Sequence, residues 1–141
     1  VVGFAGDGAF GISMSEMSSC NRKEWPSITM VIFRNYQWGA EKRNSILWFD
    51  DNFVGTELDP ELSYAKVANA CGLKGVVVKT MEETTKAIKQ SCEDQKQGIT
   101  TFIEIILNQE LGEPFRRDAM KKPVQVMGIK KEDMKPQKSL V

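Results

Sequence analysis

Four short apolar runs constrain the fold of this chain most strongly, because each is rich in valine or isoleucine and helix-like stretches separate them. They cover residues 1–5, 28–33, 75–79 and 100–107. Nearly continuous apolar character over so few positions is typical of parallel strands that are buried on both faces. The alternation of strand and helix predicts an α/β fold, a three-layer sandwich around a mainly parallel, doubly wound sheet.

Three helices are expected between these strands, over residues 13–22, 61–71 and 81–95. In the second, Asp59 is the predicted N-cap and Pro60 the first helical residue, a favoured pairing at helix starts. Thr80 is the predicted N-cap of the third. The remaining irregular stretch, residues 35–59, is too long for a plain connector and is interpreted as a functional loop with a short helix.

The length of 141 residues suits a single domain with a real core. We expect residues 1–107 to form that domain, with its N-terminal part missing, and residues 108–141 to form an extended C-terminal tail of the same domain. Three prolines and several lysines in the tail argue against a regular element there.

Composition excludes several classes of partner and chemistry. Lysine plus arginine equals aspartate plus glutamate, 19 of each, so nothing in the net charge favours nucleic acid or an anionic membrane as a partner. No apolar run reaches transmembrane length. The 3 cysteines are widely spaced, which indicates neither a disulfide framework nor a metal pair and favours a cytoplasmic location. The absence of histidine removes the commonest general base.

A glycine-rich turn follows the first predicted strand and carries one carboxylate. In Gly6-Asp7-Gly8 the glycines permit a tight turn, and the next helix start offers N–H groups to a phosphate. A carboxylate beside a phosphate requires a cation between them, and Mg²⁺ is the economical choice. The second strand ends at the same edge of a parallel sheet, where Asn35 offers an amide oxygen. The pair therefore predicts a magnesium and phosphate site.

Purely structural interpretations of these residues are also consistent with the sequence. A lone GDG occurs in many turns, Asp7 is also a plausible helix cap, and Asn35 is a plausible strand terminator. A non-enzymatic, flavodoxin-like nucleotide-binding module is the alternative of another class, although such a module has no use for Asp7 and Asn35 as a pair.

The stretch from GDG to RNYQWG resembles the cofactor-binding motif of thiamine diphosphate-dependent enzymes. The resemblance implies that thiamine diphosphate and Mg²⁺ are the cofactors, with Asp7, Asn35 and the main-chain carbonyl of Gln37 as metal ligands. It implies a cofactor-binding set of Gly6, Asp7, Gly8, Ala9, Phe10, Asn35, Gln37, Trp38 and Gly39. The chain departs from the motif at Arg34, which stands where the family has a first asparagine.

Two longer stretches, NYQWGAEKRN and LNQELGEPFRRDAMKKPV, are similar to the acetolactate-synthase-like branch of this family. The resemblance implies an acyltransferase that acts on a small-molecule substrate and phosphate. The alternative within the branch is an acetolactate synthase-like or other enzyme that uses a 2-oxo acid. Arg34, Lys42 and Arg43 flank the motif as candidates for binding an anionic substrate, although a solvated basic surface is the commoner explanation for such residues.

The resemblance also implies that this chain holds half of an active site. In the family the cofactor lies between this pyrophosphate-binding domain and a pyrimidine-binding domain of the same or a neighbouring subunit. The second domain supplies the glutamate that activates the cofactor, so no catalytic residue is assigned here and the fragment is expected to be inactive alone. A homodimer or homotetramer is expected for the full-length form.

Overall fold

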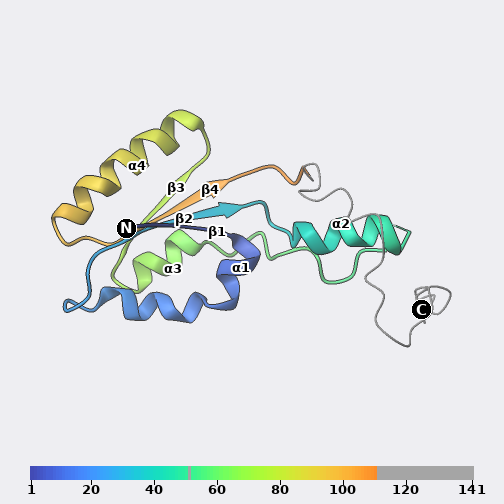
Figure 1. Cartoon of the computed structure of the whole chain (residues 1–141), viewed down its shortest axis with the longest axis horizontal. Coiled ribbons are helices and arrows are strands. Elements are labelled where there is room, and N and C mark those ends of the chain that lie inside the picture. The colour runs from blue at the N-terminus through green and yellow to red at the C-terminus, as the bar shows by residue number, and fades with distance from the viewer. Residues whose placement is uncertain (51, 111–141) are drawn as a thin grey trace. The chain divides into compact units, whose positions relative to one another are not determined.

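The computed structural model describes residues 1–50 and 52–110 (Figure 1). For residues 46–48 it describes the main chain only. The chain divides into two compact units. The first consists of Val1–Gln37 and Leu58–Gln109, and it contains the whole sheet. Of the second, the structure describes residues 38–50, 52–57 and 110.

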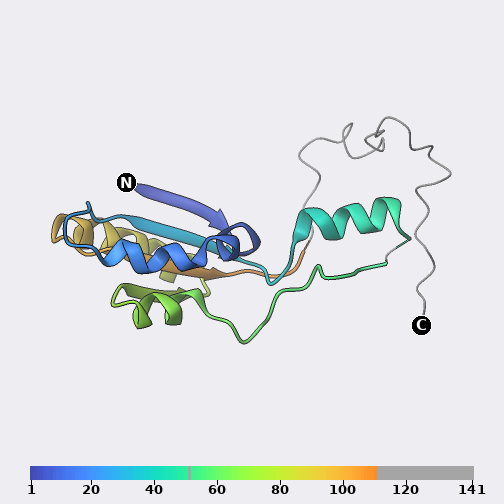
Figure 2. The same ribbon diagram turned by 90° about the horizontal axis from the view of Figure 1, so that it is seen from below.

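All four strands of the first unit run parallel, as the apolar runs predict. The sheet order is β1-β2-β4-β3, with β1 at Val2–Gly6, β2 at Thr29–Arg34, β3 at Lys74–Val78 and β4 at Thr101–Ile106. Figure 2 shows β1 leading directly into the first helix at its carboxyl end. The carboxyl ends of β1 and β2 therefore lie side by side, which places the ends of the GDG and RNYQWG stretches at one edge.

Helices cover both faces of the sheet, which confirms the doubly wound, layered architecture (Figure 1). On one face, buried Ile32 and Phe102 pack with Tyr64 and Met17 from the helical segments. On the other face, Val31, Val78, Ile103 and Ile105 pack against α4, Met81–Lys96. Alternation along each strand separates the two sets, because successive side chains of a strand point to opposite faces.

The helix between β1 and β2 starts earlier than predicted. α1 spans Asp7–Ile12, so it begins at the aspartate of the GDG turn itself, and a 3₁₀ helix, η1, follows at Met14–Asn21. The expected single helix over residues 13–22 is therefore wrong in its start and in its type. The consequence for the site is direct: Asp7 is the first residue of a helix.

The predicted start of the next helix is also wrong. α3 spans Tyr64–Ala70, and its N-cap is Ser63, whose hydroxyl oxygen accepts a hydrogen bond from Lys66 N. Asp59 instead accepts a hydrogen bond from Glu61 N at 2.8 Å. The main-chain oxygens of Asp59 and Pro60 accept hydrogen bonds from Arg34, which keeps this segment outside the helix.

The third predicted helix is confirmed with its cap. Thr80 accepts a hydrogen bond from Glu83 N at 3.1 Å, and the Glu83 carboxylate reaches back to Thr80 N at 3.2 Å. This reciprocal capping box explains the sharp start of α4. Hydrogen bonds from Lys79 N and Thr80 N hold the pKa of Glu83 below its ordinary range.

The second unit contains α2, Gly39–Trp48, which is the short helix expected within residues 35–59. Lys42 forms an ion pair with Glu57 there, and its ammonium lies 5.3 Å from the centre of the Phe53 ring. The predicted tail, residues 108–141, falls outside the described residues except for its first three. Within the described part of the chain, no helix is long and apolar enough to cross a membrane.

Candidate functional site

Asp7 lies at the point where β1 ends and α1 begins, and only 2% of its surface is exposed. Its Oδ1 accepts a hydrogen bond from Gly8 N at 2.9 Å, and its Oδ2 accepts one from Tyr36 N at 2.7 Å. Two main-chain donors thus fix both carboxylate oxygens. The carboxylate is held across the carboxyl ends of β1 and β2, as the sequence predicts for a metal ligand there.

The turn after β2 adopts a conformation that is rare for its residue type. Tyr36 has φ of 62°, in the left-handed region, where non-glycine residues are uncommon and bulky ones are strained. This conformation directs Tyr36 N at Asp7, and Tyr36 O accepts a hydrogen bond from Leu58 N at 2.9 Å. The strained residue therefore makes a specific contact with the candidate metal ligand.

Asn35 and Gln37 bring two more polar groups to Asp7. One terminal atom of the Asn35 amide lies 3.2 Å from Asp7 Oδ1 and 3.1 Å from the main-chain oxygen of Gln37. Amide oxygen and nitrogen are distinguished through their partners. A nitrogen at this position donates two hydrogen bonds, whereas an oxygen makes three oxygens converge, an arrangement that needs a cation. The three predicted metal-ligating residues therefore do lie together.

The ligand set contains a single carboxylate. Across residues 1–50 and 52–110, the structure brings together no group of three or more Asp, Glu, Cys or His side chains that could hold a metal ion. A site made of a carboxylate, an amide and a carbonyl suits a hard ion that takes oxygen ligands and shares them with a phosphate.

The beginning of α1 supplies the candidate phosphate-binding groups. Its N-cap, Gly6, provides no side-chain cap, and the Gly8 N–H is already directed at Asp7. First-turn N–H groups of a helix have no partner within the helix, so the Ala9 N–H is available for an anion by position. The Phe10 ring packs at 5.3 Å from the Tyr64 ring and 5.9 Å from the Phe102 ring, which gives it a role in the core.

Gln37 contributes its main chain to the oxygen cluster and its side chain to a buried contact. Its Nε2 donates a hydrogen bond of 2.9 Å to Gln109 O, and its buried Oε1 has no hydrogen-bond partner among the described residues. Trp38 and Gly39 belong to the second unit, where they are the N-cap and first residue of α2. Cofactor contact by this pair stays a prediction.

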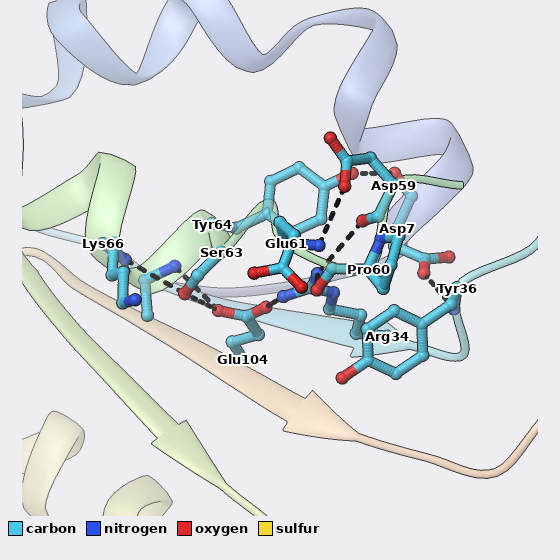
Figure 3. A network of polar contacts seen from close by, with 11 residues as sticks. Asp7, Arg34, Tyr36, Asp59, Pro60, Glu61, Ser63, Tyr64, Lys66 and Glu104 are labelled. Atoms are coloured by element: carbon cyan, nitrogen blue, oxygen red, sulfur yellow. Dashed lines mark hydrogen bonds and ion pairs between the residues drawn. The ribbon is translucent and has the colours of Figure 1, made fainter.

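Arg34 does not lie free for a substrate. It is the last residue of β2, its side chain is 5% exposed, and it forms an ion pair with Glu104 of β4, which is fully buried (Figure 3). Its Nη2 donates hydrogen bonds to Asp59 O at 3.3 Å and Pro60 O at 3.0 Å. Its Nη1 and Nη2 are thus bonded to groups inside the protein, and a role for Arg34 in binding an anionic substrate stays a prediction.

Glu104 and Tyr64 are the site residues that sequence reasoning missed. The Tyr64 hydroxyl donates a hydrogen bond of 2.9 Å to Asp7 O, and burial, reinforced by the charge of Asp7, raises the pKa of this hydroxyl. The hydroxyl therefore stays protonated and able to donate. The sequence contains one indication of the role of Glu104. It is the single charged residue within the apolar strand TFIEII, and a buried acid requires a partner.

Comparison with known proteins connects this geometry to a family. The sequence model of the family described as "Thiamine pyrophosphate enzyme, C-terminal TPP binding domain" matches residues 1–105. The chain is 70% identical, over 99% of its length, to a protein of Rhizobium meliloti (strain 1021) named "Probable sulfoacetaldehyde acetyltransferase", of which it covers 24%. It is 68% identical, over 97% of its length, to the "Sulfoacetaldehyde acetyltransferase" of Roseovarius nubinhibens, of which it covers 23%.

A solved structure supports the same fold. The benzoylformate decarboxylase of Polynucleobacter necessarius superimposes with a TM-score of 0.68 at 27% identity, over 79% of this chain and 20% of that one. The chain thus spans about a quarter of the length of the two acetyltransferases, 24% and 23%.

Proposed function

This chain belongs to the family of C-terminal, thiamine pyrophosphate-binding domains of thiamine pyrophosphate enzymes, and we propose on that basis that it forms the Mg²⁺- and diphosphate-binding half of the active site of a sulfoacetaldehyde acetyltransferase. The observation that carries the metal part is the convergence of Asp7 Oδ1, the Asn35 amide and Gln37 O. The likeness to two acetyltransferases over nearly the whole chain supports the acyltransferase part.

The donor set fits Mg²⁺. Neighbouring ligands of an octahedral ion with bonds of about 2.0–2.1 Å lie about 3 Å apart. The amide atom of Asn35 lies 3.2 Å from Asp7 Oδ1 and 3.1 Å from Gln37 O, close to that spacing. Asp7 Oδ2 accepts a hydrogen bond from Tyr36 N, whereas Oδ1, which accepts one from Gly8 N, is the oxygen that lies against the Asn35 amide. In the proposed site these three groups would hold the ion, which would supply the positive charge that offsets the diphosphate.

The remaining predicted residues take supporting parts in this proposal. Gly6 and Gly8 let the diphosphate approach the main chain, and the Ala9 N–H donates to it. Phe10 supports the turn from the core, where its ring packs on Tyr64 and Phe102. Cofactor contact by Trp38 and Gly39 stays a prediction. When bound, thiamine diphosphate supplies the nucleophilic carbon and the electron sink of the reaction. The glutamate that activates it lies, in this proposal, in a pyrimidine-binding domain of the same or a neighbouring subunit.

The proposed reaction converts sulfoacetaldehyde and phosphate into acetyl phosphate and sulfite. The carbon–sulfur bond breaks with release of sulfite, and an acetyl group passes to phosphate. Such an enzyme serves the breakdown of taurine and other sulfonates. A homodimer or homotetramer in the cytoplasm is the proposed state of the full-length protein, the location resting on its widely spaced cysteines.

An acetolactate synthase-like enzyme shares the fold, metal and cofactor and differs in substrate, so substrate assays separate the two. We therefore propose assaying the full-length protein with Mg²⁺, thiamine diphosphate, phosphate and sulfoacetaldehyde. Release of sulfite together with acetyl phosphate is the expected result. Activity with 2-oxo acids alone would transfer the proposal to the other enzyme class.

Asp7→Ala tests the metal assignment in the same protein. Glu16→Gln is the control, since Glu16 is an exposed acid of η1, the helix that follows α1. Mg²⁺-dependent binding of thiamine diphosphate should be lost in the first variant and kept in the second. Unchanged binding in Asp7→Ala would show that the ion is held elsewhere, and would favour the nucleotide-binding module.

A further inference from the structure

The ion pair of Arg34 and Glu104 lies beside the proposed metal site without facing it. In register, Glu104 lies opposite Ile32, so Arg34 is its diagonal neighbour on the same face of the sheet. The side chains are 5% and 0% exposed. A pair that is desolvated so completely is a weak source of stability, because the cost of removing both charges from water offsets their attraction.

Glu104 fixes the start of α3. While one carboxylate oxygen binds Arg34, the other accepts hydrogen bonds from Ser63 Oγ at 2.7 Å and from Ala65 N at 2.9 Å (Figure 3). Tyr64 lies between these two donors in sequence, so its main chain is pinned on both sides. Its side chain is buried and donates a hydrogen bond to the main-chain oxygen of Asp7.

Arg34 fixes the turn on the other side of Asp7. Its guanidinium carbon lies 4.4 Å from the centre of the Tyr36 ring and 5.8 Å from that of the Tyr64 ring. A guanidinium over an aromatic face is attracted to it, most strongly where water is excluded. Tyr36 needs such support because its left-handed backbone is costly, and its N–H is the donor to Asp7 Oδ2.

We propose that Arg34 and Glu104 together are positioning residues for the metal ligand Asp7, acting through Tyr36 on its carboxylate and through Tyr64 on its main chain. This rests on the proposed function, since it takes Asp7 as a magnesium ligand. The printed hydrogen bonds of Arg34 and Glu104 go to other groups of the described residues and not to Asp7. The pair sets how tightly Mg²⁺ binds, because two of the three donors that hold Asp7, Tyr36 N and the Tyr64 hydroxyl, come from tyrosines that the pair holds. The third donor is Gly8 N, within the turn itself.

The test titrates the full-length apoprotein with Mg²⁺ in the presence of thiamine diphosphate. Calorimetry measures the apparent Kd for Mg²⁺. Arg34→Met with Glu104→Met removes both buried charges while keeping similar volume, an exchange that proteins often tolerate. The apparent Kd for Mg²⁺ should rise at least about tenfold, while kcat at saturating Mg²⁺ stays within about threefold. Arg34→Lys, which keeps the charge but loses the planar fork, should give an intermediate Kd.

Tyr64→Phe keeps the test decisive if the double variant does not fold, because it removes one hydroxyl and leaves the ring packing. Its Kd for Mg²⁺ should rise by about threefold to tenfold. The control is Lys74→Met with Asp94→Leu, which removes another ion pair of the same unit, of 2.6 Å, with no contact to Asp7. The control should lower the melting temperature and leave the Kd unchanged.

The outcomes separate the two proposals. If Asp7→Ala abolishes Mg²⁺ binding while the folded double variant and Tyr64→Phe both keep the wild-type Kd within twofold, the positioning role is overturned and the metal site stands. The positioning role is also overturned if the control variant, Lys74→Met with Asp94→Leu, weakens Mg²⁺ binding as much as the Arg34 and Glu104 variants do. If Asp7→Ala itself binds Mg²⁺ normally, the metal assignment fails and the positioning role fails with it.

Discussion

The main-chain N–H of Tyr36 donates a hydrogen bond of 2.7 Å to Oδ2 of Asp7, joining the turn after β2 to the first residue of α1. This bond depends on a left-handed tyrosine, since φ of Tyr36 is 62°. The other oxygen, Oδ1, accepts a hydrogen bond from Gly8 N and lies 3.2 Å from the Asn35 amide, so main-chain donors fix the orientation of the whole carboxylate. The proposed metal ligand is thus aimed by the backbone of the neighbouring turn.

Tyr36→Val and Tyr36→Asn test this dependence on backbone conformation. Both substitutions remove the ring that lies on Arg34, but asparagine tolerates the left-handed region and a β-branched residue does not. The left-handed conformation costs most residues about 1–2 kcal/mol, so the Kd for Mg²⁺ should be about tenfold higher in the valine variant than in the asparagine variant. Equal values in titrations of the full-length protein would contradict a role for the backbone conformation.

Asn35→Ala and Gln37→Met separate a side-chain ligand from a main-chain ligand. In the proposed site Asn35 binds through its amide oxygen, whereas Gln37 binds through its carbonyl, which no substitution removes. Asn35→Ala should raise the Kd for Mg²⁺ at least about tenfold, and Gln37→Met should change it less than about threefold. The same magnesium titration checks both, and the reverse order would show that the Gln37 side chain takes part in the site.

Gly75→Ala should destabilise the protein strongly. A Cβ at Gly75 would lie 2.0 Å from the main-chain oxygen of Ala65, so β3 and α3 would have to separate. A cost of about 3 kcal/mol is expected from such overpacking. Gly6→Ala is the control, because a Cβ at Gly6 meets nothing within 4 Å and its φ is an ordinary −73°.

Gly6→Ala should cost less than about 1 kcal/mol, the scale of a change at a helix N-cap. Denaturation of the two full-length variants with urea compares these costs directly. Similar losses in both variants would contradict the close packing of β3 on α3. A Gly6→Ala variant that stays stable but binds thiamine diphosphate weakly would support close approach of the diphosphate to this turn.

Asp94 makes stability depend on pH in the acid range. Burial alone raises the pKa of this carboxyl, but hydrogen bonds from Lys74, Gln90 and Thr101 outweigh it and hold the pKa below its ordinary value of 3.8. The folded state therefore binds the proton less readily than the unfolded chain. Its contribution to stability is complete above pH 3.8 and is lost as the pH falls through the lower, folded value.

Asp94→Asn should thus be less stable than the wild type by about 2 kcal/mol at neutral pH, from the loss of charged hydrogen bonds. The difference should narrow as the pH falls below 3.8, because the wild-type carboxyl then becomes neutral as well. Urea denaturation of both full-length proteins over a pH series measures this difference. A difference that stays constant down to the acid limit would contradict the role of the charge.

Local patterns in the sequence were sufficient for much of the fold and for the place of the site. Apolar runs that alternate with helices predict the parallel sheet, and Thr80 as an N-cap predicts the start of α4. Asp7 and Asn35 were predicted to meet because parallel strands end at one edge, and they do meet there. Each of these predictions rests on residues within a helix or strand or directly next to it.

The surroundings of the site were decided only by tertiary structure. Arg34 and Glu104 are 70 residues apart, and no local pattern tells which buried acid a strand-end arginine will find. Their pairing draws the carbonyls of Asp59 and Pro60 toward Arg34, and α3 starts at Tyr64 instead of residue 61. The sequence alone thus determined which groups stand at the sheet edge. Long-range burial, which forces every desolvated charge and hydroxyl to find a partner, decided how those groups are held.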